Sequence, residues 1–204
     1  MSDCCTVATE VPADQRRLLL WVLGINAAMF LVECGVGLAV RSTALLADSV
    51  DMLGDALVYG FSLYVIRRGA AWQSRAALLK GVVMAAFGAG VLIEVAGKLV
   101  GDVVPPAPVM GGLGLLALAA NLICLALLSR RKDDDINMRS AWLCSRNDVL
   151  ANGGVLLAAA GVGITGTGWP DIVIGLLIAA MFVSSAIGVI HDARGSRLVR
   201  GPTR

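Results

Sequence analysis

Six long apolar runs dominate this chain of 204 residues, at positions 18–40, 44–66, 76–100, 109–128, 140–164 and 171–190. Each run has enough residues to cross a hydrocarbon layer of about 30 Å as a helix. Hydrophobic residues make up 57% of the chain and charged residues only 16%, which is too apolar for an ordinary soluble domain. The runs therefore predict an all-α membrane protein with six transmembrane helices.

The basic residues predict how these helices are oriented. Of the 17 lysines and arginines, 14 fall near run ends that would share one membrane face, Arg41 and Lys98 fall at the other, and Arg146 lies inside the fifth run. Because cytoplasmic loops carry the excess of positive charge, we expect both termini in the cytoplasm. The expected organisation is an N-terminal tail (1–17), a six-helix transmembrane domain (18–190) and a short cytoplasmic tail (191–204), in the inner (plasma) membrane of a bacterium.

Two pairs of polar residues interrupt the apolar runs at the same spacing. Asp51 and Asp55 lie in the second run, and Cys144 and Asp148 lie in the fifth. An ionised carboxylate at the centre of a membrane helix costs about 2.5–3.5 kcal/mol, so such residues need a reason to be there. Residues four apart share one helix face. Two such faces turned toward each other would place three carboxylates and a thiol around a divalent metal ion.

Further residues are secondary candidates for the same site or its access path: Asn26, Glu33, Asp48, Asn152, Cys4 and Cys5. Asp48 extends the acidic stripe of the second run, but it could equally cap the start of that helix. Glu33 shares a helix face with Asn26 and either lines the path and buffers protons or makes a structural hydrogen bond. Cys4 and Cys5 either receive cytosolic metal or belong to a disordered terminus without a ligand role.

Other polar residues have simpler interpretations. Glu94 and Lys98 lie four apart near the outer end of the third run, and we expect them to form an ion pair. Arg146 points away from the face of Cys144 and Asp148, and we expect it to pair with a neighbour or reach the cytoplasmic interface. The five cysteines are odd in number and three lie in apolar runs, which favours reduced thiols.

The segment 42–55, Ser-Thr-Ala-Leu-Leu-Ala-Asp-Ser-Val-Asp-Met-Leu-Gly-Asp, resembles the second-helix signature of the cation diffusion facilitator family. That family has six membrane helices, exports zinc and related divalent metals, and carries a [His/Asp]-x-x-x-Asp pair in its second and fifth helices. The resemblance matches these pairs to Asp51/Asp55 and Cys144/Asp148. Two departures are that Cys144 replaces the usual His or Asp, and that the usual cytoplasmic C-terminal domain is missing, which resembles a short form of the family.

The chemistry of the four ligands suggests both a substrate and a counter-ion. Zn²⁺ accepts Asp oxygen and Cys sulfur, and a thiolate favours zinc or cadmium over magnesium or calcium. Cobalt is also compatible with such a site. Because these ligands bind metal only when deprotonated, protons and metal compete for them. We therefore expect metal/proton antiport, with Zn²⁺, Cd²⁺ or Co²⁺ as transported substrate and no permanently bound cofactor.

Two other classes of function stay open at this point. One is a proton- or sodium-coupled transporter or channel for another substrate, and the other is a membrane scaffold subunit. An enzyme is not expected, because no Ser-His-Asp set, His-Glu-x-x-His motif or Gly-rich phosphate loop occurs. A net charge of only +2 gives no reason to expect nucleic acid as a partner. Expected partners are divalent metal ions, protons, membrane lipid and a second copy, held as a homodimer through small residues such as Ala86 and Gly90.

Overall fold

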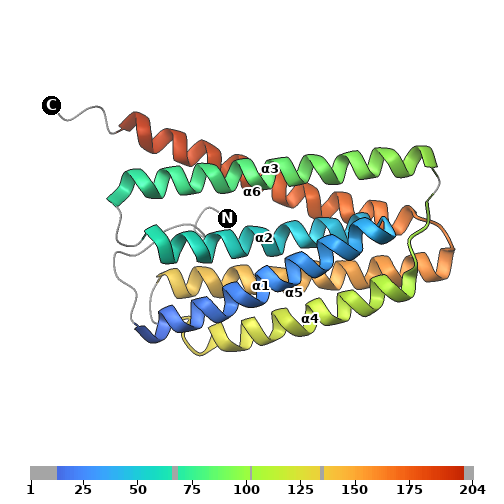
Figure 1. Ribbon diagram of the computed structural model, residues 1–204, viewed down its shortest axis with the longest axis horizontal. Coiled ribbons are helices and arrows are strands. Elements are labelled where there is room, and N and C mark those ends of the chain that lie inside the picture. Colours follow the sequence, from blue (N-terminus) through green and yellow to red (C-terminus); the bar gives the residue numbers. More distant parts are fainter. Residues whose placement is uncertain (1–12, 66–68, 102, 134–135, 200–204) are drawn as a thin grey trace.

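The computed structural model describes residues 13–65, 69–101, 103–133 and 136–199, and six helices account for nearly all of them. In chain order these are α1 (Ala13–Val40), α2 (Thr43–Val65), α3 (Gly69–Gly101), α4 (Ala107–Ser129), α5 (Ile136–Thr165) and α6 (Trp169–Val199). They lie side by side along one direction, and successive connections alternate between the two ends of the bundle (Figure 1).

The predicted helical architecture is confirmed. Apart from residue 66, which lies outside the described residues, each apolar run falls within one helix. Three stretches are long and apolar enough to cross a membrane, Asp14–Val40, Ala107–Ser129 and Ala141–Thr165, and Trp169–Met181 is a shorter apolar stretch. Helix α6 continues to Val199, nine residues past the end of the sixth run.

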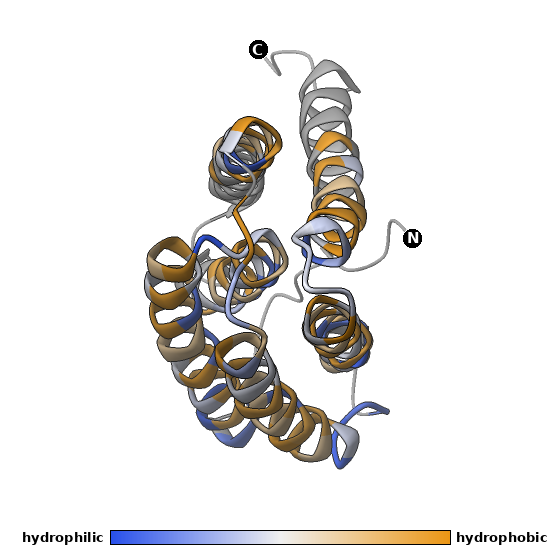
Figure 2. Ribbon diagram, turned by 90° about the vertical axis from the view of Figure 1, so that its right-hand side faces the viewer, coloured by the Kyte–Doolittle hydropathy of each residue, from blue (hydrophilic) through white to orange (hydrophobic). Residues whose placement is uncertain are grey.

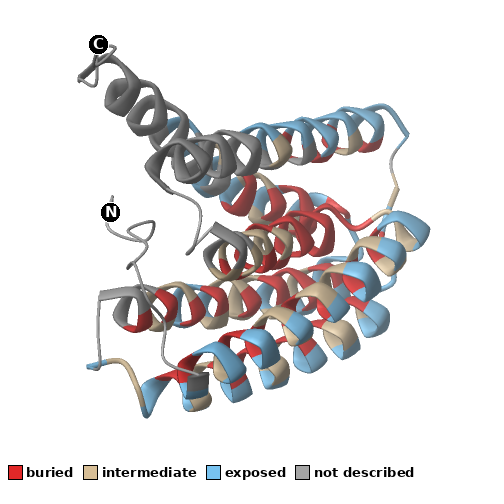
Figure 3. Ribbon diagram, turned by 60° about the vertical axis from the view of Figure 1, so that its left-hand side comes forward, coloured by how far each residue is buried: buried red, intermediate tan, exposed pale blue. Residues whose placement is uncertain are grey.

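Helix α2 lies at the centre of the bundle, in contact with α1, α3, α5 and α6. None of its described side chains is classed as exposed, whereas the other five helices each expose large apolar residues. Trp21, Ile93, Leu157 and Ile164 are more than 60% exposed. The end-on view shows apolar residues along all the helices (Figure 2), and buried residues gather toward α2 (Figure 3). An apolar surface of this extent suits contact with lipid.

Polar residues occupy the middle of the buried helix faces. In α4 the buried positions recur at alternating spacings of three and four residues, which keeps one face turned inward. An apolar cluster that includes Leu45, Val91 and Val155 lies toward the α1–α2 turn. A second cluster that includes Val22 and Leu128 lies toward the opposite end. On α2, Asp51 and Asp55 lie between Val50 of the first cluster and Tyr59 of the second.

The turn between α1 and α2 ends one helix and begins the next within two residues. Arg41 has a φ of 54°, and the N–H groups of Arg41 and Ser42 donate to the carbonyls of Leu38 and Gly37 at 3.3 and 2.9 Å. This is the Schellman pattern, in which the left-handed position is usually glycine. The Arg41 guanidinium instead pairs with Glu94 of α3 at 2.8 Å.

Asp171 of α6 holds the first turn of α2. Its carboxylate accepts hydrogen bonds from the hydroxyls of Ser42 and Thr43, from the backbone N–H groups of Thr43 and Ala44, and from the Lys98 ammonium of α3. Both partners of the Lys98–Asp171 ion pair are fully buried. The predicted Glu94–Lys98 pair is therefore wrong, because Glu94 pairs with Arg41 of the α1–α2 turn and Lys98 with Asp171 of α6.

Gly175 allows α6 to approach α2 closely enough for these bonds. A Cβ atom at this position would lie 2.7 Å from the backbone carbonyl carbon of Thr43, well inside van der Waals contact. The missing side chain lets the α6 backbone pack directly against the start of α2, one turn along from Asp171.

Candidate metal centre

Three aspartates from two helices meet in the interior of the bundle. Asp51 and Asp55 of α2 and Asp148 of α5 each offer a carboxylate oxygen, and these oxygens all lie within 4.8 Å of one another. Asp55 and Asp148 are buried, and Asp51 is half-buried. The i, i+4 spacing puts both α2 carboxylates on the face turned toward α5. We call these three residues the aspartate cluster. Carboxylate oxygens so close together are suited to a shared divalent cation.

Cys144 lies one turn before Asp148 on α5 and is half-buried. Its sulfur is not part of the set of mutually close ligand atoms, which contains the three carboxylates alone. Cys144 is near enough to Tyr59 of α2 to interact with it electrostatically. Cys34, Cys124 and Cys144 are all thiols rather than disulfides, as expected for these three positions.

Tyr59 contacts the aspartate cluster although no expectation from the sequence included it. Its hydroxyl donates to Asp55 Oδ2 at 2.9 Å and lies 3.4 Å from the Ala141 carbonyl of α5. The side chain is only 2% exposed, so this hydrogen bond forms away from water. The spacing of four residues from Asp55 was a usable signal, because a tyrosine at that position shares the acidic face. Tyr59 orients Asp55 and closes the cluster toward one end of the bundle.

Buried amides occur on α1, α4 and α5. Asn152 lies one turn beyond Asp148 and donates to its backbone carbonyl at 2.7 Å, and Asn26 of α1 donates to Val22 at 2.9 Å. The side-chain oxygens of both residues lack a partner among the described residues, as do both polar atoms of Asn121 of α4. Buried polar atoms of this kind are normally satisfied by protein, water or an ion. Asn152 thus lies one turn from a residue of the aspartate cluster, and both Asn26 and Asn152 leave acceptor atoms open among the described residues.

Glu33 and Asp48 form a separate pair of buried acids between α1 and α2. Both side chains are 0% exposed, and the carboxyl of Glu33 interacts with that of Asp48. Asp48 does not cap α2, since the first N–H groups of that helix donate to Asp171 and Ser42 instead. Of the two interpretations considered for Asp48, helix capping is therefore contradicted. Cys4 and Cys5 lie outside the described residues.

Arg146 is exposed on α5, and its guanidinium lies over the Trp142 ring at 5.5 Å from the centroid. Lys132 approaches the same ring at 5.2 Å. A cation over an aromatic face is attracted by the ring quadrupole. The expectation that Arg146 pairs with a neighbour away from the acidic face is confirmed.

Comparison with known proteins shows the family to which this chain is similar. Residues 19–196 match the family model described as the cation efflux transmembrane domain. The zinc transporter ZitB of Escherichia coli is 29% identical to this chain over an alignment 211 residues long. The alignment covers 96% of this chain and 67% of ZitB. The metal cation efflux system protein CzcD of Cupriavidus metallidurans is 27% identical over 82% of this chain and 57% of its own length.

A third relative has a more specific name. The cadmium, cobalt and zinc/H(+)-K(+) antiporter of Bacillus subtilis is 23% identical over 89% of this chain and 62% of its own length. The matched region thus spans between 57% and 67% of the length of these three relatives. With a family model that covers most of its residues, the chain belongs to the cation efflux, or cation diffusion facilitator, family.

Proposed function

We propose that this chain exports a divalent transition metal from the cytoplasm through the aspartate cluster, in exchange for protons. Zinc is the first candidate, with cadmium and cobalt as alternatives, as in the names of the relatives. The observation that carries the proposal is the convergence of Asp51, Asp55 and Asp148 within 4.8 Å in the bundle interior. Buried acids gathered from two helices are costly unless they hold an ion.

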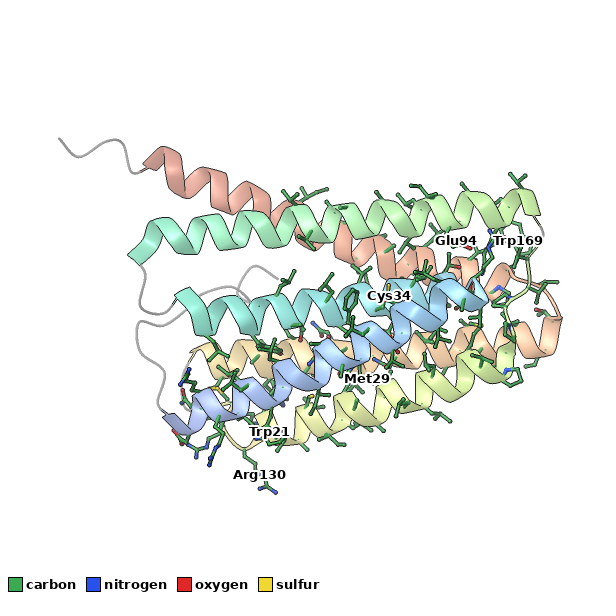
Figure 4. All side chains as sticks on the ribbon, viewed as in Figure 1. Trp21, Met29, Cys34, Glu94, Arg130 and Trp169 are labelled. Atoms are coloured by element: carbon green, nitrogen blue, oxygen red, sulfur yellow. The ribbon has the colours of Figure 1, made fainter. Side chains whose placement is uncertain are left out.

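The proposed membrane arrangement has all six helices crossing the bilayer, with both termini in the cytoplasm. The outward apolar side chains of five helices support it. Trp21 and Trp169 are exposed toward opposite ends of the bundle, where aromatic residues meet membrane interfaces (Figure 4). Arg130 lies at the end opposite Glu94 in the same view. The bacterial relatives support a plasma-membrane location.

Proton exchange follows from the ligands. A carboxylate binds metal only after it has lost its proton, so each proton that arrives weakens the hold on the metal. If the cluster opens alternately to the two sides, a more acidic exterior would release metal outward and return protons inward on the aspartates. Cys144 would complete the coordination when α5 shifts relative to α2, since its sulfur lies one turn away from Asp148. A thiolate at that position favours zinc and cadmium.

The test is zinc transport by the purified chain in lipid vesicles that carry a zinc indicator and a pH indicator. We expect uptake to accelerate with an opposing proton gradient and to be accompanied by proton movement. Asp51→Asn and Asp148→Asn should each abolish uptake, because each removes one charged ligand. Glu94→Gln is the matched control, since this acid pairs with Arg41 far from the cluster.

Each alternative function has its own outcome in this assay. A rate that ignores the pH gradient would contradict proton antiport while leaving metal transport intact. Aspartate variants that transport zinc normally would contradict the cluster as the site and would favour a scaffold role. Cys144→Ser should change the preference between zinc and cadmium, whereas a path for protons or sodium alone should not respond to that change.

A homodimer through membrane helices is part of the proposal. Ala86 and Gly90 of α3 are exposed, and a Cβ at Gly90 would meet no described residue of another helix within 4 Å. Small residues on an outward helix face permit close helix contact in membranes. Cross-linking of a cysteine introduced at Gly90 would give a disulfide-linked dimer if two copies meet at this face. A monomer under all oxidising conditions would contradict it.

A further inference from the structure

Glu33 and Asp48 are buried acids that the aspartate cluster does not include. Their carboxyl groups face each other between α1 and α2, and both side chains are 0% exposed. Among the described residues no N–H or hydroxyl group donates to the four carboxyl oxygens, so a hydrogen bond between the two acids needs a proton on one of them. Two facing acids removed from water need a compensating positive charge or proton, because each charge loses its hydration and repels the other.

The donors and cations near this pair are engaged elsewhere. The N–H groups at the start of α2 already donate to Asp171 and Ser42. At this end of the bundle the described cations are Arg41, which pairs with Glu94, and Lys98, which pairs with Asp171. Glu33 and Asp48 therefore neither cap a helix nor join one of these ion pairs.

The position of the pair connects it with the aspartate cluster. Asp48 precedes Asp51 by three residues, which is about 4.5 Å along a helix axis. The charge of Asp51 also acts on Glu33. Glu33 lies next in sequence to Cys34, which is labelled on α1 in Figure 4. The pair therefore lies one step from the cluster on the side of the α1–α2 turn.

We propose that Glu33 and Asp48 form a second, weaker site for the transported divalent cation, one helical turn from the aspartate cluster toward the α1–α2 turn. The inference rests on the proposed function, because it assumes that the cluster holds the transported metal. Ion paths commonly use neighbouring sites of moderate strength, so that an ion binds and still leaves. Two carboxylates offer only oxygen ligands and leave positions for water, which suits divalent ions such as Mn²⁺ and Zn²⁺.

The first test measures metal binding to the purified full chain. Mn²⁺ is the probe, and its aqueous electron paramagnetic resonance signal disappears on binding. In an Asp51→Asn/Asp148→Asn background, which disables the cluster, we expect a weak Mn²⁺ site to persist. Adding Glu33→Gln or Asp48→Asn should weaken that site by at least about tenfold. Adding Glu94→Gln, which changes an acid at the same end of the bundle, should leave it unchanged.

The second test measures transport with the cluster intact. Glu33→Gln and Asp48→Asn should each slow zinc uptake into vesicles by about tenfold, a size typical for loss of a supporting metal ligand. The unfolding temperature should not fall, because each change removes an uncompensated buried charge and keeps the shape of the side chain. Zinc affinity measured at equilibrium should stay close to that of the unchanged chain, since the stronger site is preserved.

The outcomes separate this inference from the proposed function. Loss of all Mn²⁺ binding in the cluster-disabled background, while the unchanged chain still binds metal, would overturn the second site alone. Full zinc uptake by Glu33→Gln and Asp48→Asn would also overturn it. If Glu33→Gln or Asp48→Asn abolished proton movement but left the weak Mn²⁺ site intact, the second metal site would be overturned. The pair would then serve protons instead. An unchanged chain that binds neither Zn²⁺ nor Mn²⁺ would refute the proposed function itself.

Discussion

Asp171 and the Glu33–Asp48 pair are buried acids that the fold treats in opposite ways. Asp171 accepts hydrogen bonds from two hydroxyls and two backbone N–H groups, and it pairs with the Lys98 ammonium. Glu33 and Asp48 accept no hydrogen bond from an N–H or hydroxyl group of the residues that the structure describes, and their carboxyls approach each other instead. A carboxylate that holds helices together is fully satisfied, whereas carboxylates that bind a passing ion must keep their oxygens available.

The two regions also belong to different parts of the bundle. Asp171 links α6 and α3 to the start of α2. The described orphan polar atoms belong to α1, α2, α4 and α5, on residues including Asn26, Asn121 and Asn152 as well as the acids. Unsatisfied groups so confined are expected at a functional site, where local stability is given up for chemistry.

The largest effect is expected from Lys98→Met, which leaves Asp171 buried without its cation. Removing one partner of a buried ion pair typically costs about 3–5 kcal/mol, because the remaining charge is uncompensated. We expect the free energy of unfolding in detergent, followed by tryptophan fluorescence, to fall by an amount of this order. A Lys98→Met/Asp171→Asn double variant should recover part of the loss, since the stranded charge is then removed.

We call the aspartate cluster, the Glu33–Asp48 pair and the amides with unpartnered atoms the open region. Asp48→Asn is the matched change in this region. It should leave the free energy of unfolding unchanged or raise it, because the amide carries no charge to compensate. If Asp48→Asn destabilised the chain as much as Lys98→Met, the distinction between a closed structural acid and an open functional one would be lost. Reduced zinc transport without reduced stability is the expected result for this variant.

We call Asp171, Lys98 and the start of α2 the closed region. Gly175→Ala tests how this region is assembled. The added Cβ would meet the Thr43 backbone at 2.7 Å, so α6 must move away from α2. Overpacking of this kind costs about 1–3 kcal/mol. The shift should also stretch the bonds from Thr43 to Asp171, so the cost should shrink when Asp171→Asn is already present. A full, additive loss in the double variant would show that the two contacts act independently.

Much of this architecture could be predicted from the sequence, because the length of an apolar run reports directly on membrane helices. The meeting of Asp51, Asp55 and Asp148 was also accessible, since spacing fixes which residues share a helix face. The Glu94–Lys98 pair was wrong for the complementary reason. Spacing describes neighbours on one helix, and it contains no information about Arg41 or Asp171, which lie outside α3 and form the actual pairs.

The Glu33–Asp48 pair shows an intermediate case. Both residues could be selected as costly acids in apolar runs, but their contact depends on the tight turn at Arg41 and Ser42. Glu33 lies eight residues before Arg41 and Asp48 six residues after Ser42, so an antiparallel hairpin brings them to a similar height. Their lack of donors could not be predicted, because it depends on where Asp171 and Ser42 direct the N–H groups of α2.

Tyr59→Phe tests the open region from its other side. The hydroxyl donates to Asp55 and favours the charged carboxylate, so its loss should let protons compete better with metal. We expect zinc affinity to fall by about tenfold, equivalent to 1.4 kcal/mol, with a larger fall at acidic than at alkaline pH. Isothermal titration at several pH values would measure it. An equal loss at every pH would indicate a purely structural role for Tyr59.

Arg41→Gly should have the smallest effect, because two opposing contributions nearly cancel. The φ of 54° strains any residue with a Cβ, and glycine would relieve about 1 kcal/mol of that strain. The same change removes the ion pair with Glu94, whose partners are 41% and 21% exposed and which is worth about 0.2–1 kcal/mol. Arg41→Ala removes the pair but keeps the strain, so it should be the less stable of the two variants in a denaturant titration. A large loss in Arg41→Gly would mean that this exposed pair supports the closed region as strongly as Lys98 does, and the contrast between buried and exposed pairs would then fail.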